Sequence, residues 1–284
     1  MSNARRVTLE PAFLLHHYPW RDTSRILELL TRTHGRVSVV ARGSRQAAAA
    51  TGGALQSFTA CLVSWSGRGE MGYLTGVERL IPTSLTSVGE VDRRSGEGSE
   101  IERPSPALRA TSPAGAGEVK MLTGERLMSG FYANELLLKL LQRHDPHPAL
   151  FDAYATLLER LRAVDQDAGR ALRIFEKRLL EELGWGLDLE QEAAGGAPIE
   201  AMRSYRYALE GGAERVDGVA EGTLIFCGAS LLSLAREVLD DPRSLADARR
   251  LLRAALDRLL DGRALRTREV LLEMRAHAGH TQGV

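Results

Sequence analysis

Cysteine is almost absent from this sequence. Its 284 residues include only Cys61 and Cys227, which are too few for a disulfide framework and too far apart for a cysteine-based metal motif. A reducing compartment is the simplest setting for such a chain. We therefore expect a cytoplasmic protein without a bound metal.

Long hydrophobic runs are also missing. No stretch of about 18 apolar residues occurs, and the first residues lack the apolar segment of a signal peptide, so we expect no export and no membrane partner. Hydrophobic residues still make up 44% of the chain, which is enough for packed cores. The length suits one large or two ordinary domains, and disorder throughout is excluded.

Lysine is scarce, and the charge is unevenly distributed. The 37 basic and 37 acidic residues cancel, which by itself predicts no affinity for nucleic acid. Residues 1–85, however, hold ten arginines against five acidic residues, a net charge of +5, whereas residues 123–284 hold 22 basic and 26 acidic residues, a net charge of −4. The neutral total is thus a cancellation between a basic front and an acidic back.

Eight of those ten arginines lie within residues 1–46: Arg5, Arg6, Arg21, Arg25, Arg32, Arg36, Arg42 and Arg45. Arginines at this density give a small module a positive face that attracts phosphate in a salt-dependent way. The alternative, a solvated basic face without a ligand, is equally compatible with the charge alone.

The first 85 residues show the pattern of short strands. Apolar or alternating runs occupy residues 12–16, 24–31, 37–41, 55–64 and 71–80, and glycine- or proline-containing turns separate them. Five strands of this size predict a small closed barrel.

The rest of the chain changes character twice. Residues 86–122 are rich in Ser, Gly, Pro and charge, which predicts a disordered linker or loop. Residues 123–284 show helical periodicity at 123–141, 149–161, 167–183, 228–239, 244–260 and 266–277, with an acidic, glycine-rich insertion at 184–222 that holds one short strand at 205–207. The predicted fold class is α+β, a barrel followed by a mainly helical domain.

Motifs that carry catalysis are missing. There is no G-x-S-x-G, P-loop, H-E-x-x-H or kinase signature, which favours a binding protein over an enzyme and predicts no cofactor. Residues 67–72 match G-x-G-x-x-G, but a strand pattern follows where a dinucleotide site needs a helix, so we predict a hairpin turn. The close histidine pairs, His144 with His147 and His277 with His280, lack further ligands and are expected to be solvated.

Aromatic residues accompany the arginines of the front: Phe13, Tyr18, Trp20, Phe58, Trp65 and Tyr73. Barrels that bind single strands combine basic grooves with aromatic faces on which bases stack. We expect Phe13 and Phe58 to fill the barrel core and Trp20, in a loop beside Arg21, to be a stacking residue.

Several of these segments, taken in order, form a set of motifs that is similar to those of a known protein family. They include AFLLHHYPWRDTS at 12–24 and SGFYANELL at 129–137, together with residues 35–45, 55–58, 67–70, 171–176, 183–186, 205–207 and 265–269. This arrangement resembles the RecO family of bacterial DNA repair proteins, a family of recombination mediators. The resemblance covers nearly the whole chain except residues 86–122.

The resemblance implies that the front is an OB-fold DNA-binding domain. It also implies that the protein binds single-stranded and double-stranded DNA, anneals complementary strands and, together with RecR, helps to load RecA onto DNA coated by single-strand-binding protein. The resemblance further implies association with the nucleoid and no enzymatic turnover. Relatives contact the acidic, hydrophobic C-terminal tail of the single-strand-binding protein. A protein adapter for that tail, with only weak non-specific DNA binding, is the alternative.

Site residues follow from both lines of reasoning. The DNA-binding candidates are Trp20, Arg21, Arg25, Arg36, Arg42 and Arg45; Arg42 and Arg45 match the family's basic loop, and Arg36 is a weaker match. Arg173 matches a basic residue that helps to receive the tail peptide, with Leu172 and Phe175 as apolar neighbours. Alternatively, Arg173 is a surface arginine paired with Asp165, Asp167 or Glu176. Some relatives bind zinc through four cysteines in the helical domain, where this chain has only Cys227, so no zinc is expected.

Overall fold

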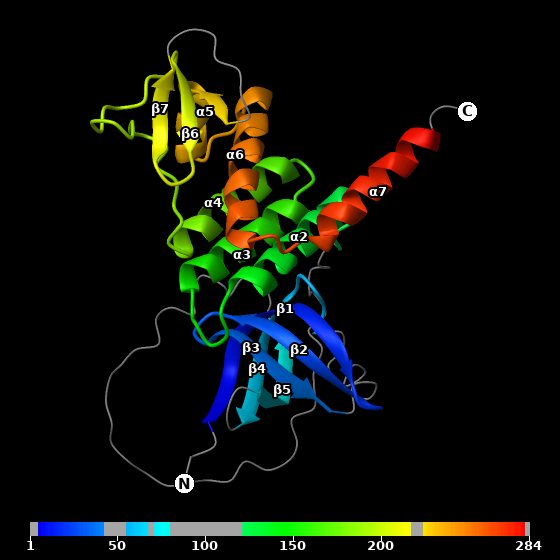
Figure 1. Cartoon of the computed structure of the whole chain (residues 1–284). Helices are drawn as coiled ribbons and strands as arrows, with labels where there is room; N and C mark the ends of the chain where they lie inside the picture. Colours follow the sequence, from blue (N-terminus) through cyan, green and yellow to red (C-terminus); the bar gives the residue numbers. More distant parts are fainter. Residues whose placement is uncertain (1–4, 43–54, 68–70, 80–120, 217–223, 282–284) are drawn as a thin grey trace, which may run out of the picture.

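The computed structural model describes residues 5–42, 55–67, 71–79, 121–216 and 224–281. Arg45 and nearly all of the predicted linker at 86–122 lie outside these residues. Within them, a barrel of strands carries a group of helices on one side, and a small sheet lies at the far end of the helices (Figure 1).

The barrel consists of β1 (Arg5–Trp20), β2 (Ser24–Thr31), β3 (Gly35–Ala41), β4 (Ala60–Gly67) and β5 (Met71–Arg79). The closed order β1-β2-β3-β5-β4, with β3 and β5 parallel and the other pairs antiparallel, confirms the predicted five-stranded OB-fold barrel. Of the segment 67–72, residues 68–70 lie outside the described residues; Gly67 ends β4 and Met71 begins the antiparallel strand β5, as the predicted hairpin requires, and a strand rather than a helix follows the glycines.

Strand β1 is much longer than the predicted segment at 12–16. It bends through two register shifts, at Val7/Glu10 and Leu14/His16, which let one strand pair with both β4 and β2. Because β4 pairs only with Arg5–Phe13, Pro19 lies on an edge segment, where the lack of an N–H group is tolerated. Trp20 is therefore the last residue of a strand and not part of a loop.

The predicted place of Phe13 and Phe58 in the barrel core is wrong. The barrel interior is made by Val7, Ala12, Leu14, Leu27, Leu29, Val37, Val39, Ala41, Cys61, Val63 and Trp65. Side chains alternate along a strand, so Ala12 and Leu14 turn Phe13 outward, where its ring lies 5.0 Å from that of Phe151. Both phenylalanines join the barrel to the core of the helical domain.

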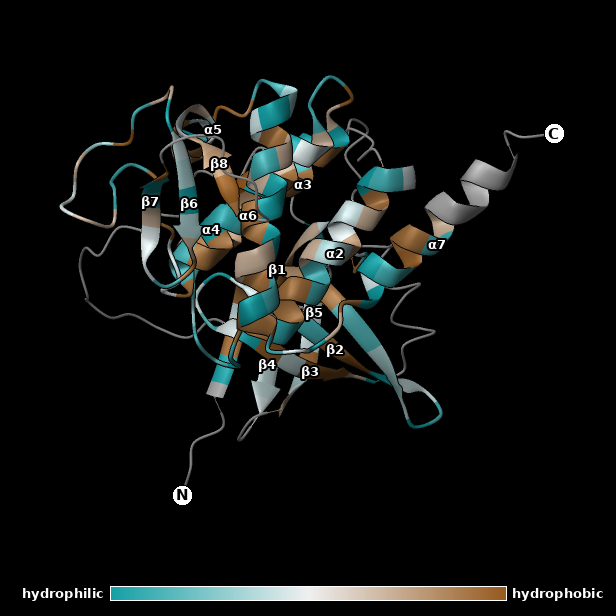
Figure 2. Ribbon diagram, turned by 45° about the horizontal axis from the view of Figure 1, so that its top comes forward, coloured by the Kyte–Doolittle hydropathy of each residue, from teal (hydrophilic) through white to brown (hydrophobic). Residues whose placement is uncertain are grey.

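The helical domain contains α2 (Gly124–Leu140), α3 (Pro148–Arg162), α4 (Ala168–Glu182), α5 (Gly228–Ala235), α6 (Pro242–Leu260) and α7 (Arg266–Thr281), which confirms the six predicted helices. Aspartates cap two of them: Asp167 accepts a hydrogen bond from the Arg170 N–H and Asp241 from the Ser244 N–H. Hydrophobic residues gather where the helices meet one another and the barrel (Figure 2).

A tight contact fixes the barrel against the helices. Gly35 adopts a positive φ of 65°, and a Cβ at this position would lie 2.1 Å from the Asp145 carbonyl oxygen in the α2–α3 loop. Beside it, the His144 N–H donates to the Arg36 carbonyl oxygen at 3.0 Å. Only glycine permits this approach of two backbones.

The insertion at 184–222 builds a small sheet. Its two strands are β6 (Ser204–Ala208) and β7 (Gly212–Val216), and β8 (Ile225–Cys227), which follows the insertion, completes the order β7-β6-β8, so the short strand predicted at 205–207 is confirmed as β6. Two acids of this region, Glu192 and Glu200, pair with Arg215 of β7. The helices of the described residues are all too short or too polar to cross a membrane.

Candidate functional site

Side chains of neighbouring strands form a row around the outside of the barrel, in which the β3 member, Val40, is buried. Neighbouring strands place register partners side by side on one face, and here the partners run around the barrel from β1 to β2, β3, β5, β4 and back to β1. This outer row consists of Tyr18, Ile26, Val40, Tyr73, Ser66 and Arg6. Tyr18 and Tyr73 are 46% and 47% exposed, although both are large aromatic residues.

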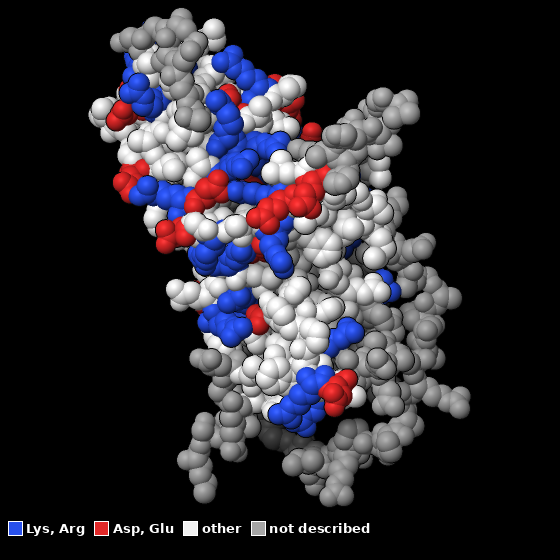
Figure 3. All heavy atoms as spheres, turned by 45° about the vertical axis from the view of Figure 1, so that its right-hand side comes forward, with Lys and Arg blue, Asp and Glu red and all other residues white. Residues whose placement is uncertain are grey.

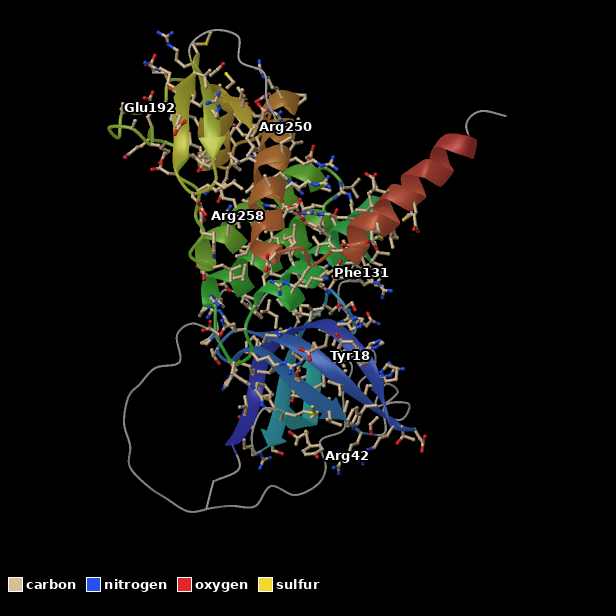
Figure 4. All side chains as sticks on the ribbon, in the orientation of Figure 1. Tyr18, Arg42, Phe131, Glu192, Arg250 and Arg258 are labelled. Carbon is tan, nitrogen blue, oxygen red and sulfur yellow. The ribbon has the colours of Figure 1, made fainter. Side chains whose placement is uncertain are left out.

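Arginines adjoin this row at the end of the barrel that lies farthest from the helices. The Arg42 guanidinium lies over the Tyr73 ring, 4.4 Å from its centroid, and Figure 4 shows Arg42 at this end, with Tyr18 closer to the helices. Arg25 is exposed and pairs with Ala41, the residue before Arg42. The β1–β2 hairpin adds Arg21 in its turn and Trp20, which is 43% exposed.

Arg36 lies elsewhere. Its Nη1 donates to the Leu138 carbonyl oxygen of α2 at 2.7 Å and lies 3.9 Å from a carboxylate oxygen of Glu28. Glu28 is buried and also pairs with Arg143 at 2.8 Å. Burial lowers the pKa of Arg36. This arginine therefore joins the barrel to the helices.

A cavity of about 620 Å³ opens in the helical domain between α2, α4, α6 and α7. Its lining holds five arginines and one acidic residue, Glu125, beside apolar walls. We call it the arginine cavity; its basic residues are Arg173, Arg249, Arg250, Arg253 and Arg268, and its leucines are Leu172, Leu245, Leu271 and Leu272. On the face drawn in Figure 3, Lys and Arg side chains form a band across the helical half of the molecule, with acidic side chains among them.

Arg173 is the most buried arginine of this lining, at 8% exposure. Its Nη2 lies 2.9 Å from Oε1 of Glu176, one of the three acids expected as alternative partners. Asp167 instead caps α4. Arg173 thus lines the cavity while it is ion-paired.

Helix α7 forms one wall of the arginine cavity, and a carboxylate holds its first turn. Glu135 of α2 accepts hydrogen bonds from the Arg266 N–H at 2.9 Å and the Thr267 N–H at 3.0 Å, and from the Thr267 hydroxyl at 2.7 Å. A negative charge at a helix N-terminus is favourable because the backbone N–H groups there have no partners within the helix. This contact places Arg268 and Leu271 at the cavity.

Both halves of the chain match family models. Residues 5–81 match the model described as "Recombination protein O N terminal", and residues 121–269 match "Recombination protein O C terminal". A curated relative named DNA repair protein RecO, from Aromatoleum aromaticum, is 36% identical over 274 residues, which cover 96% of this chain and 99% of the relative. Relatives of the same name from Alkalilimnicola ehrlichii and Nitrosococcus oceani are 41% and 38% identical, over 95% of this chain and 92% and 95% of their own lengths. The chain belongs to the RecO family.

The structure of this RecO-family protein brings together part of the predicted sites. Trp20, Arg21, Arg25 and Arg42 lie at one end of the barrel, whereas Arg36 lies at the helical junction. Leu172 and Arg173 line the arginine cavity, but Phe175 is buried in the core, with its ring 6.1 Å from that of Tyr154.

Other residues of the two sites were not selected from the sequence of this RecO-family chain. The sequence marks Tyr18 and Tyr73 only as aromatic residues, and periodicity does not say which face of a strand is exposed. The arginines of α6 could have been found from the spacing of Arg249 and Arg253 on one helical face, but only tertiary structure places them opposite α4 and beside Arg268 of α7.

The two histidines of the α2–α3 loop in this RecO-family chain differ: His144 is exposed, as predicted, and only His147 departs from the prediction. His147 is not fully solvated: it lies 3.3 Å from a carboxylate oxygen of Asp145 and 3.6 Å from one of Glu182. His277 and His280 have side chains outside the described set. Among the described residues, no group of three or more His, Cys, Asp or Glu side chains could hold a metal ion.

Proposed function

We propose that this protein is a recombination mediator that anneals complementary DNA strands and, with RecR, helps to load RecA onto DNA coated by single-strand-binding protein. It acts by binding, in the cytoplasm and associated with the nucleoid, without catalytic turnover. In this scheme the barrel (residues 1–85) binds DNA, residues 86–122 connect the domains, and the helical domain (123–284) binds partners. The observation that carries the proposal is the outer row with Arg42 over Tyr73.

The outer row supports binding of single-stranded DNA. Bases stack on exposed aromatic rings, and arginines neutralise the phosphates between them. Tyr18 and Tyr73 supply the rings, and Trp20, Arg21, Arg25 and Arg42 supply a further ring and the charges. Arg45 stays a candidate from its place in the sequence. The same arginines serve double-stranded DNA through phosphate contacts alone.

The arginine cavity supports binding of the C-terminal tail of the single-strand-binding protein. An acidic, hydrophobic tail needs cations beside an apolar groove, because its carboxylates require charged partners and its apolar side chains require burial. Arg173 and Arg268 supply cations, and Leu172 and Leu271 supply apolar walls. Phe175 supports the groove only from the core.

Annealing of complementary strands tests both halves of the proposal. The strands are used bare, coated with single-strand-binding protein, or coated with that protein lacking its tail. The double variant Arg42→Ala, Tyr73→Ala should anneal slowly in all three cases, and Arg173→Ala should be slow only on strands coated by the protein with its tail. Arg79→Ala removes an exposed arginine at the other end of β5 and is the control.

The adapter function is the second candidate, and the five arginines of the cavity lining favour it. If the double barrel variant anneals bare strands as fast as the unmodified protein while Arg173→Ala fails on coated strands, the barrel is not the annealing surface. The adapter then replaces the mediator as the function.

A further inference from the structure

One buried carboxylate lies beneath three groups that line the arginine cavity. Glu176 of α4 is 0% exposed and is not part of the lining. Its Oε1 lies 2.9 Å from Nη2 of Arg173 and accepts a hydrogen bond from the Tyr132 hydroxyl at 2.8 Å. The Tyr132 oxygen in turn accepts a hydrogen bond from Nη2 of Arg268 at 3.3 Å. Glu176 thus connects α4 to α2 directly and to α7 through Tyr132.

The stability of the fold does not explain this carboxylate. Burying a charge costs several kcal/mol unless its partners compensate fully, and one oxygen of Glu176, Oε2, has no hydrogen-bond partner among the described residues. An apolar side chain of similar size would avoid that cost. Burial accordingly raises the pKa of Glu176.

The arginines of the cavity explain the presence of this buried carboxylate better. Guanidinium groups that share one cavity repel each other and would turn toward water, which adds a reorganisation cost to ligand binding. Glu176 holds the Arg173 side chain, and the Tyr132 hydroxyl, together with Asp257, which pairs with Nη1, holds Arg268, whose guanidinium also lies 5.6 Å from the centre of the Tyr132 ring. Groups fixed in this way bind a ligand without first being ordered.

We propose that Glu176 is a positioning residue: it directs Arg173, and through Tyr132 also Arg268, toward the carboxyl group at the end of an acidic peptide. The proposal rests on the function proposed above for the arginine cavity. It adds a specificity, because two fixed guanidiniums distinguish a free terminal carboxylate from an amide.

Simple electrostatics predicts the opposite change in peptide affinity when Glu176 is neutralised, so the direction of the change distinguishes the two explanations. If Glu176 only lowered the positive charge of the cavity, its neutralisation would strengthen binding of an acidic peptide. If it positions the arginines, neutralisation weakens binding and removes the preference for a free carboxylate.

The test uses the full chain and a fluorescein-labelled peptide of aspartates ending in phenylalanine, made as the free acid and as the C-terminal amide. Fluorescence anisotropy gives the affinity for each. We expect Glu176→Gln to bind the free acid about tenfold more weakly, as for loss of a charged hydrogen bond, and the ratio of acid to amide affinity to approach one. Tyr132→Phe, which removes the hydroxyl that contacts both Glu176 and Arg268 but leaves the Arg173–Glu176 pair in place, should lose about threefold.

Glu237→Gln is the matched control. This carboxylate pairs with Arg178 at 2.7 Å and Lys177 at 3.3 Å outside the cavity lining, so its loss should leave the ratio unchanged.

Thermal unfolding verifies that each variant is folded, and Tyr132→Phe decides the question if Glu176→Gln is not folded. If Glu176→Gln is folded and binds the free acid as tightly as the unmodified protein or more tightly, the proposal is overturned. If Glu176→Gln is not folded, the same result with Tyr132→Phe overturns it. If the unmodified protein ignores the peptide, or Arg173→Ala binds it as well, the function proposed for the cavity fails first, and the role of Glu176 with it.

Discussion

The barrel and the helical domain both present arginines, but they hold them differently. On the barrel, Arg21, Arg25 and Arg42 are exposed, and the described partner of the Arg42 guanidinium is the Tyr73 ring. In the arginine cavity, Arg173 is buried and paired with Glu176. Exposed arginines tolerate many positions of a phosphate chain, whereas fixed ones select one compact anion. The same residue type thus suits a polymer in one domain and a defined peptide end in the other.

Salt should separate the two sites most strongly. If about four phosphates are neutralised on the barrel, affinity for single-stranded DNA falls about 50-fold between roughly 50 and 200 mM salt, because each contact releases counterions. Binding of the acidic peptide should fall only several-fold, since Arg173 is buried and salt screens a buried charge less than an exposed one. Fluorescence anisotropy titrations at a series of salt concentrations measure both slopes. Equal slopes would remove the distinction between the sites.

The loss of one cavity arginine should be the next largest effect. Arg173→Ala removes a charged partner of the peptide and leaves Glu176 buried without its ion pair, so we expect peptide affinity to fall about 30-fold and the protein to lose roughly 3 kcal/mol of stability. DNA affinity should not change, because the barrel is untouched. Peptide titration, urea unfolding and DNA titration of the same variant measure the three quantities. A parallel fall in DNA affinity would show that the sites are not independent.

Loss of an aromatic residue of the outer row should have a smaller effect, and it should weaken binding of DNA instead of binding of the peptide. Tyr73→Ala removes a stacking surface and the ring beneath Arg42, so single-stranded DNA should bind about tenfold more weakly, with peptide binding unchanged. Tyr73→Phe keeps the ring and is the control, with near-normal affinity expected. Anisotropy with single-stranded DNA is the measurement. If Tyr73→Ala binds DNA normally, the outer row is not the DNA surface.

The sequence predicted local patterns well and tertiary placement poorly. Apolar periodicity located all six helices and the barrel, because each element buries one face wherever it packs. It misplaced Phe13, since alternation does not tell the face inside the barrel from the face that meets the helices. It could not foresee that Arg36 would reach Leu138 of α2, because that contact joins residues 102 positions apart. The arginine cavity was missed in part for the same reason, as its lining comes from four helices.

Acid should loosen the cavity before it affects the barrel, and this is the smallest effect expected. Burial alone would raise the pKa of Glu135, but hydrogen bonds from Thr267 and Arg266 lower it, so that on balance the pKa lies below its ordinary value of 4.5. A carboxyl group whose pKa is lower in the folded state contributes stability that is fully present above pH 4.5 and is lost as the pH falls through the lower, folded-state pKa. In this chain that stability is the attachment of α7, so acid should release the wall that carries Arg268.

Glu135→Gln should cost about 1 kcal/mol of stability, the usual value of a helix cap, and this difference should vanish in acid. Urea unfolding of both proteins from neutral pH to below pH 4 measures it, with Glu181→Gln, an exposed carboxylate paired with Lys177, as the control. A difference that persists unchanged in acid would mean that the charge of Glu135 does not hold α7, and that the cavity wall stays in place by packing alone.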